Sequence, residues 1–129
     1  MYHIPEVEQL LAAHPKTKQQ LLEWQKKGLR LFQTSALEAD GEKEAVMPEV
    51  DDKMALQYAT ASFALNPRAL YEFFDEEKVF VVILPPTEEK NKFSFKINGV
   101  ESEQTFAARI TAEQAAFYEA ISITEKNLI

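Results

Sequence analysis

The segment of residues 79–100 constrains the fold of this chain more than any other part of its sequence. It begins with an uninterrupted β-prone run, Val-Phe-Val-Val-Ile-Leu, which two prolines end. Further on, apolar and polar residues alternate up to Asn98-Gly99, a dipeptide that strongly favours a tight β-hairpin turn. Such a turn pairs Ile97 with Val100. The segment therefore predicts antiparallel strands, and the unbroken apolar run predicts an interior strand buried on both faces.

These signals lead us to expect an α+β domain in which an antiparallel meander follows N-terminal helices. The strands are expected at about residues 79–84, 92–98 and 100–110. Thr111 and Gln114 have the spacing of a capping box, which predicts the start of a closing C-terminal helix.

Helix signals dominate the first half of the chain. Pro5 and Pro15 each suit the first turn of a helix, and apolar residues at helical spacing follow both. Asp51 or Asp52 is expected to cap a third helix, and residues 66–67, Asn-Pro, open a fourth. The apolar residues that we expect the fourth helix to bury are Leu70, Phe73 and Phe74.

Residues 29–50 fit two different structures. In one, they form a further hairpin that turns at Asp40-Gly41. In the other, the second helix continues to Ala39, at a cost of ~1 kcal/mol for Gly28 in its interior. We favour the hairpin, because two lysines followed by this glycine are typical of a helix end.

The composition excludes several classes of protein. The chain has 129 residues, which predicts a single domain over residues 1–129. It contains no cysteine, which excludes disulfides and thiolate metal sites, and its net charge of −7 argues against nucleic-acid binding. No apolar run approaches the ~20 residues that cross a bilayer, and no signal-peptide pattern is present. We therefore expect a cytoplasmic protein without a membrane segment.

Few residues suggest catalysis or cofactor binding. The three glycines are isolated, so they do not form a phosphate-binding loop. His14 lies on the apolar stripe of the first helix, where we expect a structural role. The acidic stretch that begins at Asp40 has Ala45 and Asp51 where a calcium loop needs its glycine and its bidentate glutamate. We therefore expect no cofactor, no metal and no catalysis.

The negative charge is concentrated in the middle of the chain. Residues 39–77 carry ten acidic and three basic groups, whereas the segments on either side are almost neutral. Such a segment predicts a surface that attracts a basic protein partner. Trp24, beside two lysines, is a further candidate contact. The candidate partner-binding residues are Trp24, Asp40, Glu42, Glu44, Glu49, Asp51, Asp52, Glu72, Asp75, Glu76 and Glu77.

The leading hypothesis is a small, acidic, non-catalytic binding or regulatory module that engages a protein partner through this middle segment. Two alternatives stay open. In the first, the aromatic-rich α+β domain encloses an apolar pocket of more than ~300 Å³ for a small molecule. In the second, two close, buried carboxyl groups form the centre of a hydrolase or lyase. The sequence leaves the oligomeric state open.

Overall fold

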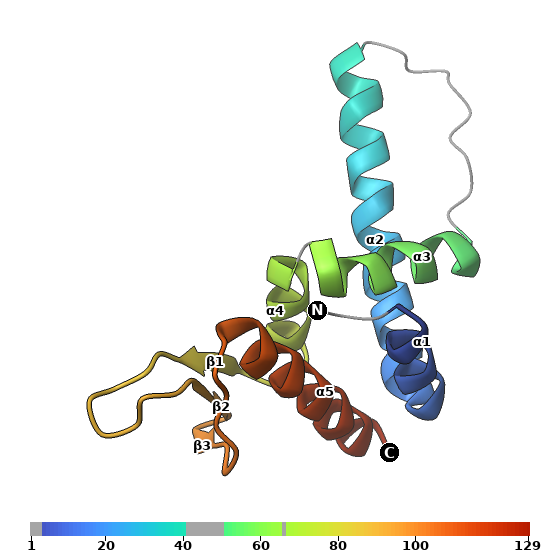
Figure 1. Ribbon diagram of the computed structural model, residues 1–129. Coiled ribbons are helices and arrows are strands. Elements are labelled where there is room, and N and C mark those ends of the chain that lie inside the picture. Colours follow the sequence, from blue (N-terminus) through green and yellow to red (C-terminus); the bar gives the residue numbers. More distant parts are fainter. Residues whose placement is uncertain (1–3, 41–50, 66) are drawn as a thin grey trace.

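The computed structural model describes residues 4–40, 51–65 and 67–129 of the chain (Figure 1). Within these residues it shows five helices and one antiparallel sheet with the strand order β1-β2-β3, so the α+β fold is confirmed. The elements in chain order are α1 (Ile4–Ala13), α2 (Pro15–Asp40), α3 (Asp52–Leu65), α4 (Pro67–Glu76), β1 (Val81–Leu84), β2 (Ser94–Ile97), β3 (Val100–Glu101) and α5 (Arg109–Leu128).

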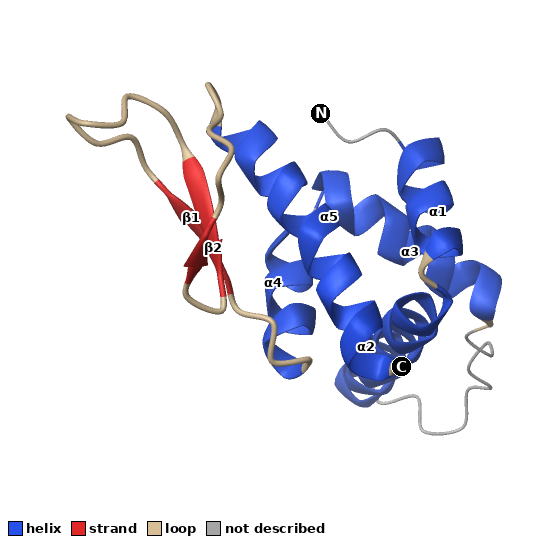
Figure 2. Cartoon of the chain, turned by 90° about the horizontal axis from the view of Figure 1, so that it is seen from below, coloured by secondary structure: helices blue, strands red, loops and turns tan. Residues whose placement is uncertain are grey.

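Helix α5 lies between the sheet and the N-terminal helices (Figure 2). It contacts α2 and α4 as well as β1 and β2. Three of its buried residues are alanines, which let neighbouring backbones approach closely, while Phe117 and Ile121 fill the interior. Every described helix, together with β1 and β2, contributes to the same hydrophobic cluster. No helix in the described part of the chain is both long and apolar enough to cross a bilayer.

Several helix boundaries agree with the sequence. Helix α1 ends before Pro15, and α2 begins at this residue. Asp51 caps α3, because its Oδ1 accepts a hydrogen bond from the backbone amide of Met54 at 2.8 Å. Helix α4 begins at Pro67. Its buried residues are Leu70, Phe73 and Phe74, as expected.

The prediction of a strand after Gly28 is wrong. Helix α2 continues through this glycine to Asp40, which is the alternative that the sequence left open. The backbone of Gly28 does not have a positive φ, and a Cβ atom there would meet nothing within 4 Å. The continuing helix therefore tolerates the glycine at a cost of only ~1 kcal/mol. The expected turn and return strand over residues 41–50 lie outside the described residues.

The hairpin at Asn98-Gly99 is confirmed. Both residues have positive φ angles, 52° and 83°, as the tight turn requires. Ile97 pairs with Val100 as predicted, and Lys96 pairs with Glu101 next to it. This turn fixes which side chains of β2 face helix α5.

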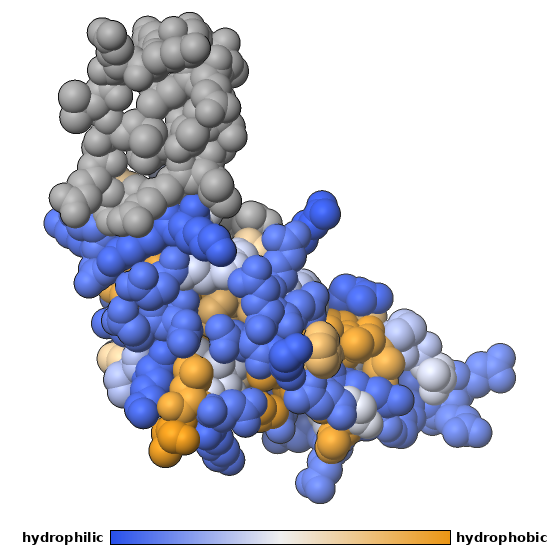
Figure 3. All heavy atoms as spheres, turned by 180° about the vertical axis from the view of Figure 1, so that it is seen from behind, coloured by the Kyte–Doolittle hydropathy of each residue, from blue (hydrophilic) through white to orange (hydrophobic). Residues whose placement is uncertain are grey.

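The run at residues 79–84 does not form an interior strand. The strand begins at Val81 and lies at an edge of the sheet, because the chain supplies only β2 as its neighbour in the described structure. Phe80 and Val82 are each 52% exposed, so one face of this segment meets solvent. Hydrophobic side chains accordingly gather at the surface over the sheet (Figure 3).

The third strand is much shorter than the expected 100–110. It ends at Glu101, and only an isolated bridge between Phe93 and Phe106 continues the pairing. The intervening polar residues form local hydrogen bonds instead of a ladder. The predicted capping box at Thr111 is also wrong. Helix α5 already starts at Arg109, and the Thr111 hydroxyl donates a hydrogen bond to the Ala108 carbonyl.

Candidate functional site

A groove of about 630 Å³ separates the β2-β3 hairpin from helix α5, and we call it the hairpin groove. Part of its wall is the segment between the end of β3 at Glu101 and the Phe93–Phe106 bridge, where the chain rejoins the sheet ahead of α5. Three of its ten lining residues are glutamates, and none of the ten carries a positive charge. The lining residues are Phe95, Ile97, Asn98, Val100, Glu101, Ser102, Glu103, Gln104, Glu119 and Ile123.

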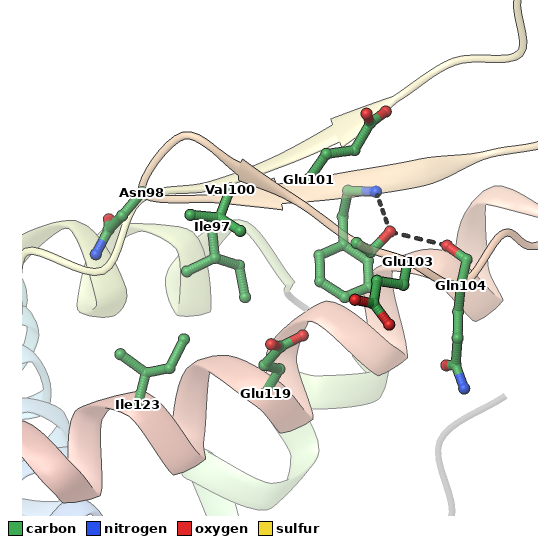
Figure 4. Close-up of a pocket in the computed structure, with 10 residues that line it drawn as sticks. Ile97, Asn98, Val100, Glu101, Glu103, Gln104, Glu119 and Ile123 are labelled. Carbon is green, nitrogen blue, oxygen red and sulfur yellow. Dashed lines mark hydrogen bonds between the residues drawn. The ribbon is translucent and has the colours of Figure 1, made fainter.

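Two carboxylates face each other across this groove (Figure 4). Glu103 follows β3 and points toward α5, while Glu119 projects from α5 toward the hairpin. Both side chains are exposed to solvent. Ile97 and Ile123 lie beside them and supply apolar walls. The groove therefore combines negative charge with hydrophobic surface.

Local hydrogen bonds hold the wall that carries Glu103. The Ser102 hydroxyl accepts a hydrogen bond from the backbone amide of Phe95 at 3.2 Å and donates one to the carbonyl of Gln104 at 2.8 Å (Figure 4). The Ser102 amide also donates to the Phe95 carbonyl at 2.7 Å. These bonds tie the segment after β3 to the central strand, so Glu103 has a defined place at the groove.

The third glutamate has a different role. Glu101 points away from α5, on the other side of the hairpin (Figure 4). Its carboxylate forms a partly exposed ion pair with Lys90 at 3.5 Å and accepts a hydrogen bond from the buried Ser94 hydroxyl at 3.2 Å. Because Glu101 already has these partners, Glu103 and Glu119 are the acidic groups available to a ligand in the groove.

Among the acidic residues named from the sequence, those whose side chains the structure describes lie in two separate places. Asp51 and Asp52 lie at the start of α3, whereas the acidic residues at 72–77 lie toward the opposite end of the α3-α4 unit (Figure 1). Asp51 serves as a helix cap, and Asp52 forms an ion pair with Lys26 of α2. Asp40 is the last residue of α2. The remaining candidates outside the described residues are Glu42, Glu44 and Glu49.

The acidic residues near the end of α4 are mostly solvated. Glu72 forms an exposed ion pair with Arg68 at 3.6 Å, and Asp75 and Glu76 are exposed. Glu77 differs, because burial and then repulsion from Glu76 raise the pKa of its carboxyl group.

Trp24 lines a second, smaller hollow, which we call the Trp24 pocket. Its indole packs edge to face against Phe73, with 5.8 Å between ring centroids, so one side belongs to the core. The other side borders a mainly apolar space of about 320 Å³ between α2, α3 and α4. The lining residues are Trp24, Gln25, Gly28, Tyr58, Ala61, Ser62 and Ala69.

His14 has the structural contacts that the sequence predicted. Its Nδ1 lies 2.8 Å from the Leu10 carbonyl, and its Nε2 lies 3.3 Å from the Ser122 hydroxyl, so the ring joins the end of α1 to α5. Among the side chains that the structure describes, the buried polar ones are three threonines and a serine, so none is a carboxyl group. The described residues also contain no group of three side chains placed to hold a metal ion.

Sequence reasoning missed both groove carboxylates. The sequence prediction placed Glu103 as a polar residue inside the expected strand 100–110, and Glu119 in the closing helix. They are separated by one helix start and one bend, and the segment that contains them is almost neutral as a whole. Only the early end of β3 brings them to one groove. Comparison of this chain with protein-family models, with curated proteins and with solved structures finds no match.

Proposed function

We propose that this protein is a non-catalytic module that binds a basic segment of a protein partner in the hairpin groove. The observation that carries the proposal is the placement of Glu103 and Glu119 on opposite walls of a groove with apolar sides and no positively charged lining residue. A cationic side chain between these walls is attracted by both carboxylates.

The apolar walls favour a particular kind of ligand. Lysine and arginine join a charged head to a hydrocarbon stem, and such stems pack along hydrophobic surface while the head stays near water. In the groove, the stem lies against Ile97 and Ile123 while the head reaches the two glutamates. A simple cation uses only half of these contacts. A peptide in which basic and apolar residues alternate uses them all.

This proposal keeps the acidic binding module inferred from the sequence and moves its contact surface. The acidic groups of α3 and α4 add a long-range negative potential that attracts a basic partner, while the groove supplies the contacts. Both charge effects depend on exposed groups, so association weakens as salt is added.

Fluorescence anisotropy with short labelled peptides tests the proposal. The probe alternates lysine with leucine, and a matched peptide carries glutamate in place of lysine. We expect the basic peptide alone to bind. The double variant Glu103→Gln, Glu119→Gln should bind it roughly two- to thirtyfold more weakly, because an exposed ion pair contributes about 0.2–1 kcal/mol.

The matched control is Glu88→Gln with Glu89→Gln, which removes the same charge from the exposed loop after β1. It should bind the basic peptide nearly as well as the natural chain. If both double variants lost the same affinity for the basic peptide, the effect would come from net charge alone and not from the groove. Binding of the acidic peptide would contradict the proposal.

The Trp24 pocket supports a second candidate function, the binding of a small apolar molecule. Its volume of about 320 Å³ is near the lower end of ligand sites, and its walls are mainly apolar. Trp24 is the only tryptophan, so its fluorescence reports on this pocket directly. Benzyl alcohol should shift the emission of the natural chain but not that of Ala61→Leu, which fills the space. An equal shift in both would exclude this pocket, and Ala12→Leu on the exposed face of α1 is the matched control.

A further inference from the structure

Within the described residues, one backbone edge of strand β1 has no neighbouring strand. Phe80 and Asn98 stand opposite each other, and the Asn98 amide donates to the Phe80 carbonyl at 3.0 Å. In an antiparallel ladder, the backbone N–H and C=O groups of every second residue point toward the paired strand. Those of Phe80 and Val82 therefore face β2, and those of Val81 and Ile83 point away from it. Among the described residues, none forms a hydrogen bond with the N–H or C=O groups of these two residues.

The outer face beside this edge is apolar. Phe80 and Val82 are each 52% exposed, and Leu84 on the same face is half-buried. Natural sheets protect free edges with charged residues, prolines or bulges. Residues 79–84 contain no charged residue and no proline, and the prolines that follow limit only the length of the edge. The segment therefore combines unpaired backbone groups with an exposed hydrophobic stripe.

We propose that a second copy of this chain pairs with β1 in antiparallel orientation, about a two-fold axis at Val82. The free backbone groups lie one residue to either side of this axis, so Val81 of each copy exchanges hydrogen bonds with Ile83 of the other. On the outer face, Phe80 meets Leu84 of the second copy, and the two Val82 side chains meet on the axis. The two three-stranded sheets become one continuous sheet.

The symmetry of the edge favours a second copy as its occupant. The two free positions and the apolar stripe are both symmetric about the same residue, Val82, so one edge complements itself without any further partner. Self-pairing also brings no like charges together along the strand, because residues 79–84 are uncharged. Strands of this length bury less than the ~1,200 Å² of a typical stable interface, so the dimer is weak and depends on concentration.

Sedimentation equilibrium over a wide concentration range tests the dimer. The natural chain should change from monomer to dimer as its concentration rises. Val82→Lys and Val82→Glu should each stay monomeric, because like charges then stand directly opposite on the axis. An equimolar mixture of the two variants should dimerise again, since opposite charges face each other. This recovery also shows that both variants are folded.

The matched control is Val100→Lys, which places the same charge on a 72% exposed valine of β3, away from the β1 edge. It should dimerise like the natural chain. Hydrogen exchange at the amides of Val81 and Ile83 should slow as concentration rises. A natural chain that stays monomeric at every concentration, a dimer that survives Val82→Lys, or a mixture that stays monomeric would each overturn the proposal.

The dimer and the hairpin groove are tested separately. Val82 lies on the outer face of the sheet and is not part of the groove, so Val82→Lys should bind the basic peptide like the natural chain. Val100 lines the groove, so Val100→Lys should weaken peptide binding without affecting the dimer. Failure of one proposal therefore leaves the other intact.

Discussion

Glu125 of helix α5 accepts hydrogen bonds from the backbone amide of Thr17 at 2.8 Å and from the Thr17 hydroxyl at 3.0 Å. Its other carboxylate oxygen accepts one from the Lys16 amide at 3.3 Å. Both amides belong to the first turn of α2, where a helix leaves its N–H groups without internal partners. A side chain of the last helix therefore caps a helix that starts more than a hundred residues earlier.

This cap predicts a pH-dependent contribution to stability. Burial by itself raises the pKa of Glu125, but hydrogen bonds from Thr17 and Lys16 and the nearby His14 lower it below its usual value. A carboxyl group with a lowered pKa stabilises the fold above its unfolded pKa and loses this contribution as pH falls through its folded pKa.

Glu125→Gln should therefore lower the midpoint of urea unfolding more at neutral pH than at about pH 3. Glu8→Gln, on the exposed surface of α1, is the control and should change the midpoint little at either pH. The same loss for Glu125→Gln at both pH values would show that its charge is not involved in the cap.

Phe117 is predicted to be the most sensitive position of the core. It is fully buried, and its ring contacts Tyr71 at 5.0 Å, Phe74 at 5.8 Å and Phe63 at 6.2 Å between centroids. Phe117→Ala should lower the free energy of unfolding by about 3–5 kcal/mol in urea titrations. Phe117→Leu should lose less, and Ile110→Ala, at a half-exposed site on the same helix, should change little. Similar losses in all three variants would contradict this account of the core.

The hairpin turn depends on the two roles of Asn98. This residue adopts a positive φ of 52°, and its Oδ1 accepts a hydrogen bond from the Phe80 amide at 2.8 Å. Asn98→Gly and Asn98→Ala both remove this acceptor, but glycine also removes the Cβ that the left-handed region disfavours, whereas alanine keeps it. The alanine variant should therefore be less stable than the glycine variant by about 1 kcal/mol in urea titrations. The reverse order would show that the turn is not strained at this residue.

Glu77 is predicted to oppose folding at neutral pH. Burial and then repulsion from Glu76 raise its pKa, so its charged form is disfavoured in the folded chain. A carboxyl group whose pKa is raised in the folded state makes a contribution to stability that is fully present below its unfolded pKa. This contribution is lost as pH rises through its folded pKa. Glu77→Gln should therefore raise the melting temperature at neutral pH and leave it nearly unchanged at about pH 3. Glu76→Gln should give a smaller gain of the same sign, and a lower melting temperature for Glu77→Gln at neutral pH would contradict the prediction.

The parts of the fold that depend on local signals could be predicted from the sequence. Asn98-Gly99 fixes the hairpin register by the conformation of its own backbone, and Pro15 and Pro67 mark helix starts by their fixed φ. The segment after Gly28 was harder, because a local stop signal competed with a helical pattern whose packing the sequence did not reveal. The helix prevailed because one interior glycine costs little.

The remaining features depend on which elements become neighbours. Residues 79–84 have the composition of an interior strand, yet their burial was decided by the number of strands available on either side. Glu103 and Glu119 come together only through the bend between β3 and α5, which propensity does not predict. Charge summed along the sequence pointed instead to the middle segment, whose described acids lie at opposite ends of two helices.

Chemical-shift mapping by NMR tests the central claim most directly. The basic lysine-leucine peptide is added to the isotope-labelled chain, and the methyl signals of Ile97, Val100 and Ile123 are followed together with the indole signal of Trp24. We expect the three methyl signals to shift progressively and the indole signal to stay in place, since the first group lines the hairpin groove and Trp24 does not. Shifts confined to Trp24 and its neighbours, or no shifts at saturating peptide, would contradict the groove as the binding site.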